Sequence, residues 1–109
     1  MQRVVTTLIT VALAASLLAT TAHAEEKAGR FKDSGMKKYL RKNYAGAVAD
    51  FDKYLAKNPS EGTIILLRGL SKSLLKPEDV TGACADFLVV KAGLKDMNVE
   101  TYCAGKPGW

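Results

Sequence analysis

The sequence predicts an all-α protein of five helices, the last of them short, and three observations predict it. Apolar residues recur at helical spacing along two stretches, and no segment alternates apolar and polar residues as a strand would. The phrase Gly-Ala-x-Ala-Asp-Phe also occurs twice, at residues 46–51 and 82–87. A helical segment repeated in this way is typical of a helix-turn-helix repeat.

The first 24 residues have the pattern of an export signal. Arg3 precedes an apolar stretch at residues 4–19, and the small residues Ala22 and Ala24 flank His23 before the expected cleavage site. Thr and Ser interrupt the apolar stretch, which is short for a membrane span of about 20 apolar residues. We expect cleavage after Ala24 and a periplasmic or secreted domain of residues 25–109. An uncleaved amino-terminal anchor is the alternative.

The charge of the chain is mild, with a formal net value of +5 at pH 7. Acidic residues are interleaved with basic ones, as in the run Asp50-Phe51-Asp52-Lys53. The sequence therefore predicts no continuous basic surface with aromatic residues in it. Proteins that follow a phosphate backbone usually have such a surface, and we therefore expect no nucleic acid as a partner. Weak contact with an anionic membrane surface or with cell-wall polymer stays open.

The two halves of the chain align at a nearly constant offset. Four pairs of matching residues are 34 positions apart: Phe31 and Ile65, Gly35 and Gly69, Lys38 and Lys72, and Leu40 and Leu74. Three later pairs are 36 positions apart: Ala47 and Ala83, Asp50 and Asp86, and Phe51 and Phe87. The second copy therefore contains two extra residues, which we place in the turn around residues 76–80.

Apolar spacing and punctuation define each expected helix. The first is expected at residues 28–42. The second has one continuous apolar stripe, and Asn58-Pro59 ends it; the stripe consists of Tyr44, Ala47, Val48, Phe51, Tyr54 and Leu55. Ser60 is expected to cap the third helix, at residues 61–76, and Pro77 separates it from the fourth. The fourth stripe consists of Val80, Ala83, Cys84, Phe87 and Val90. Asp96 is the expected N-cap of the short fifth helix, which ends before Gly105.

These positions resemble the tetratricopeptide repeat family, whose units consist of two packed helices. The first unit supplies Phe31, Gly35, Ala47, Phe51 and Pro59, with Tyr54 where the family usually has Ala. The second supplies Ile65, Gly69, Ala83 and Phe87, with Val90 in place of Ala and Lys95 in place of Pro. The resemblance implies an α-α superhelix of two units, at about 28–59 and 60–95, followed by a capping helix at about 96–104. Small residues such as Gly35 and Ala47 allow paired helices to approach closely.

Two such units are fewer than the three or so that repeats of this kind need for stability. Cys84 lies on the inward stripe of the fourth helix, and Cys103 lies near the end of the expected cap. Exported proteins favour disulfides, so we expect a Cys84–Cys103 bond that fixes the cap to the second unit. Free thiols, pairing between chains and a redox role remain the alternatives.

The residues for catalysis and metal binding are few. His23, the one histidine, lies in the expected leader, so residues 25–109 contain no imidazole base. No zinc set can be built from two cysteines without histidine unless carboxylates help. Asp50 and Asp86 recur at equivalent places, and we expect them to face solvent or cap a neighbouring turn. We therefore predict no enzyme activity, no metal site and no cofactor.

The resemblance implies a function as a scaffold or adaptor. In this family the first helices of successive units line a concave groove that holds a segment of a partner protein. The corresponding residues here form an apolar floor with a basic rim that also includes Lys37; the expected partner-binding residues are Lys32, Met36, Tyr39, Leu66, Leu70 and Lys72. The alternative is a self-associating, homodimeric structural module of a cell-envelope complex.

Overall fold

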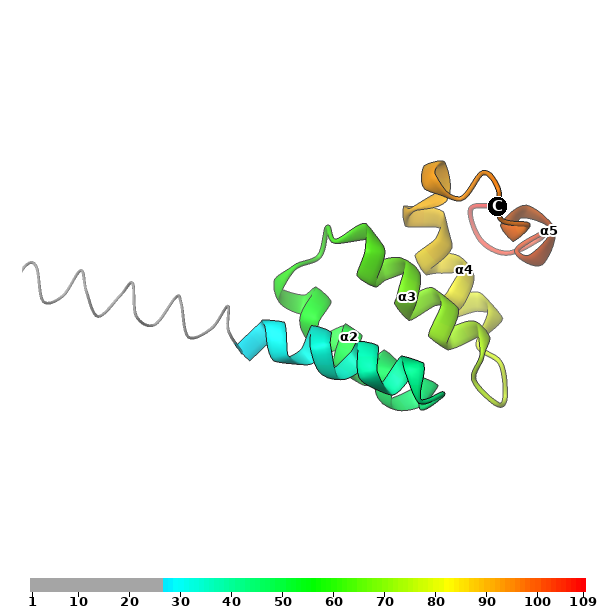
Figure 1. Cartoon of the computed structure of the whole chain (residues 1–109). Coiled ribbons are helices and arrows are strands. Elements are labelled where there is room, and N and C mark those ends of the chain that lie inside the picture. The colour runs from blue at the N-terminus through cyan, green and yellow to red at the C-terminus, as the bar shows by residue number, and fades with distance from the viewer. Residues whose placement is uncertain (1–26) are drawn as a thin grey trace, which may run out of the picture.

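The computed structural model describes residues 27–109, so the expected leader and its cleavage site lie outside the described residues. Within residues 27–109 the fold is all-α, as predicted, and contains no strand (Figure 1). A helix at residues 27–40, here called the first described helix, comes before the other elements. They are α2 (Tyr44–Lys57), α3 (Gly62–Ser73), α4 (Val80–Val89), the 3-10 turn η1 (Lys91–Gly93) and α5 (Val99–Tyr102).

The four longer helices form two antiparallel pairs. Figure 1 shows the first described helix lying across α2, and α3 lying across α4, with α5 beyond α4. Short turns join successive helices, which keeps neighbours in the chain adjacent in space. The first described helix and α3 therefore lie on the same side of the molecule.

The second helix of each pair begins with the same side-chain cap. Asn43 Oδ1 accepts a hydrogen bond of 3.1 Å from the Gly46 backbone N–H at the start of α2. Asp79 Oδ1 accepts one of 2.9 Å from the Gly82 N–H at the start of α4. Each cap satisfies an N–H group that has no partner within its helix.

Both pairs also have the same close contact between a glycine and a phenylalanine ring. A Cβ added at Gly35 would lie 2.6 Å from the nearest ring atom of Phe51, and one at Gly69 would lie 2.8 Å from that of Phe87. These distances are below any ordinary carbon contact, so only glycine allows each helix to approach its partner this closely. The close approach expected at Gly35 is therefore present in both pairs.

The buried side chains form two cores. The first lies between the first described helix, α2 and α3; its members are Ala28, Ala47, Phe51, Tyr54, Leu55, Ile64 and Ile65. The second joins α4 to the segment that follows it; its members are Ala83, Cys84, Phe87, Leu94, Val99 and Cys103. Val90 packs against both cores, and Leu66 and Leu70 of α3 pack against the second. Helix α3 thus contributes side chains to both cores.

Several expected helix boundaries were wrong. Glu61 rather than Ser60 occupies the N-cap of α3, and its side chain makes no cap bond because it is used elsewhere. Asn98 rather than Asp96 precedes α5, because a turn closed by a hydrogen bond from the Met97 N–H to the Leu94 carbonyl delays the helix. The first described helix ends at residue 40 and α3 at Ser73, short of the expected 42 and 76. The 3-10 turn η1 was not predicted.

Candidate functional site

Asp50 of α2 is buried between the helices of the first pair. It is 5% exposed, Ser34 Oγ donates a hydrogen bond of 2.6 Å to it, and Lys38 Nζ lies 2.9 Å from its Oδ2. Desolvation by itself would raise the pKa of Asp50, but the bonds from Ser34 and Lys38 outweigh it, so the pKa lies below its usual value. The ionised carboxylate thus joins α2 to the first described helix.

Asp86 of α4 occupies the equivalent place in the second pair. It is 4% exposed, and Arg68 of α3 donates to both its oxygens, at 3.0 and 2.7 Å, while Lys72 Nζ lies 3.1 Å away. The hydrogen bonds to Asp86 raise the pKa of Arg68. Arg68 also contacts Asp52 of α2 at 2.9 Å, so this guanidinium bridges three helices.

The expectation that Asp50 and Asp86 face solvent was therefore wrong. The close approach at Gly35 and Gly69 brings the first helix of each pair against these carboxylates, which places a lysine within reach of each. A buried carboxylate needs such partners, because an unpaired buried charge is costly. The 34-residue spacing of Lys38 and Lys72 was the sequence signal for these pairs, whereas no signal indicated Arg68.

Lys32 is held at the junction between the first pair and α3. Its ammonium lies 2.6 Å from Glu61 Oε1, and the Tyr54 hydroxyl donates to the other oxygen of the same carboxylate. The bonds from Lys32 and Tyr54 lower the pKa of Glu61, and the bond to Glu61 raises the pKa of Lys32. Glu61 thus links the start of α3 to both helices before it.

The structure gives the expected partner-binding residues unequal exposure. Met36 is 39% exposed, whereas Tyr39 is half-buried and stacks edge-on against Tyr44 with ring centres 5.7 Å apart. Leu66 and Leu70 are half-buried against the second core.

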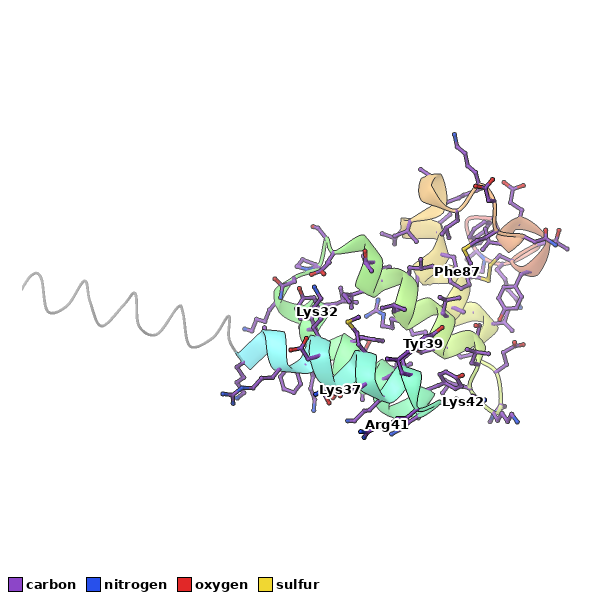
Figure 2. The ribbon with its side chains drawn as sticks, viewed as in Figure 1. Lys32, Lys37, Tyr39, Arg41, Lys42 and Phe87 are labelled. Atoms are coloured by element: carbon purple, nitrogen blue, oxygen red, sulfur yellow. A yellow bond between two sulfur atoms is a disulfide. The ribbon has the colours of Figure 1, made fainter. Side chains whose placement is uncertain are left out.

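The three expected rim lysines are not equivalent. Lys32 is partly exposed and paired with Glu61, while Lys72 is largely buried against Asp86. Figure 2 shows Lys37 on the edge of the first described helix away from α3, on the same side as Arg41, while Lys32 lies on the opposite edge. Lys32 is thus the rim lysine that combines exposure with a place on the α3 side.

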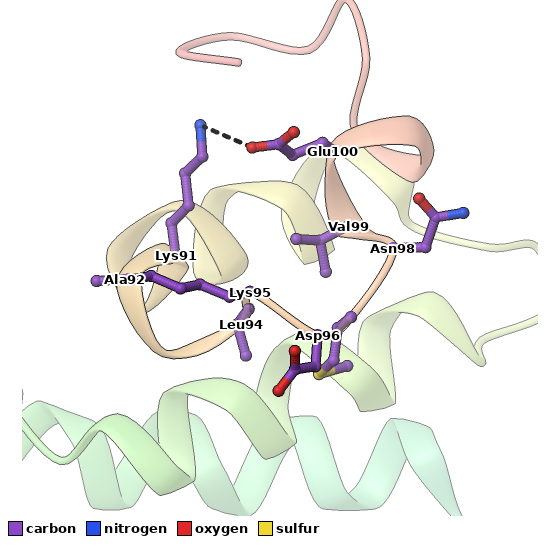
Figure 3. A pocket seen from close by; sticks show the side chains of 9 residues that line it. Lys91, Ala92, Leu94, Lys95, Asp96, Asn98, Val99 and Glu100 are labelled. Carbon is purple, nitrogen blue, oxygen red and sulfur yellow. Dashed lines mark ion pairs between the residues drawn. The ribbon is translucent and has the colours of Figure 1, made fainter.

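An open hollow of about 730 Å³ lies beside the segment that connects α4 to α5 (Figure 3). The residues around it come from η1, the following turn and α5; they are Lys91, Ala92, Leu94, Lys95, Asp96, Met97, Asn98, Val99 and Glu100. Lys91 Nζ and Glu100 Oε1 are 4.0 Å apart across it. Sequence reasoning missed this hollow because it depends on η1.

A second hollow, of about 450 Å³, lies between the turn after the first described helix and the end of α3. Its lining residues are Lys42, Asn43, Tyr44, Ala45, Leu74, Leu75 and Lys76. It therefore combines an apolar floor with a lysine from each of the two turns.

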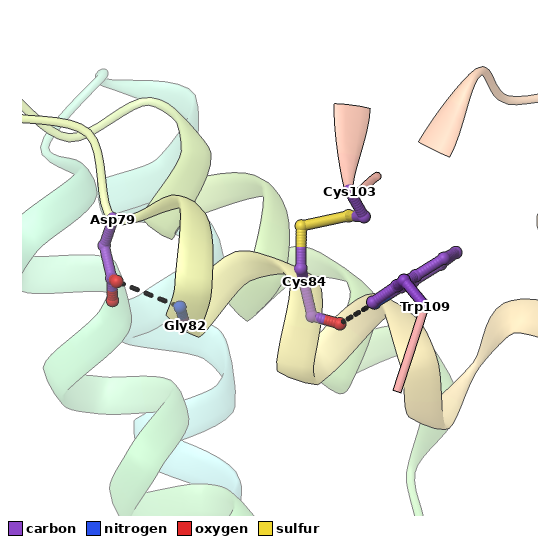
Figure 4. Close-up of a disulfide and its surroundings, with 5 residues drawn as sticks. All are labelled: Asp79, Gly82, Cys84, Cys103 and Trp109. Atoms are coloured by element: carbon purple, nitrogen blue, oxygen red, sulfur yellow. Dashed lines mark hydrogen bonds between the residues drawn. A yellow bond between two sulfur atoms is a disulfide. The ribbon is translucent and has the colours of Figure 1, made fainter. Parts of the chain in front are cut away.

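The expected disulfide between Cys84 and Cys103 is formed, with the Cα atoms 5.6 Å apart and both residues almost fully buried (Figure 4). It joins α4 to the end of α5. Trp109 folds back onto the same place, where its indole Nε1–H donates a hydrogen bond of 3.0 Å to the Cys84 carbonyl. Lys91 Nζ lies 4.7 Å from the centre of the Trp109 ring. The cap is thus attached to α4 by a covalent bond and by the tail.

The described residues contain no group of three or more side chains placed to bind a metal ion. No helix in residues 27–109 has the length and apolar character needed to cross a bilayer. Neither a protein-family model, nor a curated protein, nor a solved structure matches this chain.

Proposed function

We propose that the protein is an exported scaffold of the tetratricopeptide type, without enzyme activity, that binds a segment of a partner protein. The observation that carries this proposal is the recurrence of one set of contacts in both helix pairs. Each pair has a capped second helix, a glycine against a phenylalanine ring, and a lysine against a buried aspartate. These contacts occur at the offsets of 34 and 36 residues that suggested the family.

The proposed binding face lies on the side shared by the first described helix and α3. Met36 and Tyr39 of the first described helix and Leu66 and Leu70 of α3 would contribute apolar surface. Lys32 would contribute a cation at the edge. Lys72 would contribute only indirectly, because its ammonium is paired with the buried carboxylate of Asp86. A face of two helices is short, and a partner segment of a few residues would cover it.

Export is the second part of the proposal. The leader pattern at residues 1–24 supports it, and so does the disulfide, since such bonds persist in oxidising compartments. The periplasm and the extracellular medium are the compartments that we propose.

Site-specific crosslinking in the producing cell tests the binding face. A photoreactive phenylalanine analogue is placed at Met36, which is 39% exposed on the proposed face, and in a separate variant at Val89, which is 70% exposed on α4. We expect a discrete crosslinked protein from position 36 that is absent from position 89. Untagged protein that carries Met36→Glu, added as a competitor, should leave the crosslink intact. Untagged wild-type protein, added at the same concentration, should remove it.

The identity of the crosslinked species separates the two candidate roles. A product twice the mass of the protein indicates a homodimer, and light scattering of the purified protein would then show the same dimer. A different protein indicates an adaptor. Equal crosslinking from positions 36 and 89 contradicts a binding face on the first described helix.

A further inference from the structure

Two leucines at one end of the molecule are exposed in a way that the helix pairs do not explain. Leu40, at the end of the first described helix, is 79% exposed, and Leu74, just after α3, is 44% exposed. They are equivalent residues, 34 positions apart. The turns that follow the two helices line the same hollow, and Figure 1 shows both helices ending at the same end of the domain. An exposed leucine thus recurs at equivalent places in the two helix pairs.

Each exposed leucine is followed two positions later by an exposed lysine. These are Lys42 and Lys76, which both line the second hollow. Arg41 and Lys37 are also exposed on the adjoining edge of the first described helix (Figure 2). Within the part of the chain that the structure describes, none of these four cations has an acidic partner. We call the surface formed by Leu40, Arg41, Lys42, Leu74 and Lys76 the basic end.

Positive charge is dense in the stretch of chain that leads into this end. Residues 37–42 contain four lysines and arginines and no acid, whereas residues 43–109 contain eight basic and eight acidic residues. The acids nearest in sequence to Lys76 are Glu78 and Asp79, two exposed carboxylates against the four cations Lys37, Arg41, Lys42 and Lys76. Asp79 caps α4, and Glu78 lies near Tyr102, whose pKa is raised first by burial and then by the Glu78 charge. The basic end therefore faces solvent with a net positive charge.

These features favour an anionic membrane surface over an acidic protein. The side chain of Leu40 is 79% exposed, as expected of a residue that enters the interfacial region of a bilayer. The cations come from two turns and one helix edge, and a set spread over several segments suits a diffuse layer of negative head groups. A second copy of the chain is a poor match, because residues 43–109 are electrically neutral.

We propose that the basic end binds the surface of a bilayer that contains anionic phospholipid. Leu40 and Leu74 enter the interface, and the surrounding lysines and Arg41 lie among the head-group phosphates. This contact leaves the face of Met36 and Leu66 free, and it does not depend on the proposed binding of a partner there. It would hold the scaffold at a membrane in a fixed orientation.

Vesicle binding tests the proposal. The full chain is expressed with its leader, purified in the form that the cell yields, and titrated with vesicles of phosphatidylcholine alone or mixed with phosphatidylglycerol. We expect binding to the anionic vesicles and little to the neutral ones, with the anionic binding lost at about 1 M salt, where the screening length is near 3 Å. Equal binding to both vesicles, or none to either, overturns the proposal.

Charge variants locate the surface. Lys42→Gln with Lys76→Gln should weaken binding about 25-fold, since each cation near an anionic surface is worth about fivefold. The matched control is Lys57→Gln with Lys95→Gln, which removes two exposed cations away from the basic end and should change binding by less than about twofold. An equal loss in both double variants shows that net charge alone matters and overturns the assigned surface.

Apolar variants separate a bilayer from a soluble anion. Leu40→Ser with Leu74→Ser should weaken vesicle binding by at least about fivefold, because two exposed leucines lose apolar area in the interface. Val89→Ser, at another exposed apolar residue, should have no effect. Unchanged binding after loss of both leucines, or tighter binding of soluble polyglutamate than of vesicles, points to an acidic protein partner and overturns the lipid proposal. Circular dichroism checks that each variant is folded.

Discussion

Single residues determine how closely the helices pack and how their charges are neutralised. Gly35 and Gly69 allow contact with the rings of Phe51 and Phe87, and the same approach buries Asp50 and Asp86. Each buried carboxylate has a lysine partner from the facing helix. Close packing and internal ion pairing are therefore two consequences of the same small residue.

The lowered pKa of Asp50 predicts how stability depends on pH. Because the folded pKa lies below the unfolded value of 3.8, Asp50 contributes stability above that pH and loses it as the pH falls below. Asp50→Asn should therefore be less stable than the wild type at neutral pH, and its unfolding free energy should decline less as the solution is acidified past 3.8. Urea unfolding on both sides of that pH measures the difference.

The exposed Asp96→Asn variant is the control for this pH experiment. It should follow the wild-type curve. If the unfolding free energy of Asp50→Asn runs parallel to that of the wild type at every pH, then Ser34 and Lys38 do not lower the pKa of Asp50.

Alanine substitution of two helical glycines tests the close contact. Gly69→Ala places a methyl group 2.8 Å from the Phe87 ring and should cost about 1–3 kcal/mol, because the core must shift. Gly29→Ala meets nothing within 4 Å in the first described helix and should stabilise the protein by about 0.5–1 kcal/mol. Urea unfolding of the two variants gives both values. Stabilisation by both substitutions would contradict the close approach at Gly69.

At the scale of elements, the sequence predicted which segments are helical better than where they end. The apolar stripes of α2 and α4 determine one buried face each, and such periodicity is readable without a structure. The ends depend on local hydrogen bonds that composition does not reveal. Lys42, for example, in the turn just after the first described helix, has a φ of 63°, a conformation for which the sequence offers no glycine. Glu61 likewise serves Lys32 and Tyr54 instead of its own helix.

The contacts of Trp109, in the tail after α5, predict that loss of this side chain destabilises the cap. Trp109→Ala removes ring packing on the second core and should lower the unfolding free energy by about 2 kcal/mol. Trp109→Phe retains most of the ring but loses the hydrogen bond to the Cys84 carbonyl, and should cost about 1 kcal/mol. Chemical unfolding followed by circular dichroism separates these values. No loss in the alanine variant would show that the tail does not support the cap.

The whole molecule has two similar helix pairs and a cap of a different kind. The repeat in the sequence predicted the helix pairs and the short segment after them, and the two cysteines predicted how that segment is attached, so most of the helical arrangement was predictable. The expected interaction surface was less predictable, because the exposure of each lysine depends on whether it already has a carboxylate partner. Lys72 is neutralised by Asp86, while Lys42 and Lys76 are exposed at the basic end. The sequence repeats these lysines at the same offset, as the pairs Lys38 and Lys72 and Lys42 and Lys76, and only their contacts distinguish them.

The central claim is that two helix pairs become a stable domain when the cap is bonded to α4. Thermal unfolding of the oxidised and the reduced protein tests it most directly. Closing the loop between Cys84 and Cys103, 19 positions apart, is worth about 3 kcal/mol in the chain-entropy model. For a domain of this size, reduction should lower the melting temperature by roughly 12 °C or more. Melting at the same temperature in both states would contradict the claim.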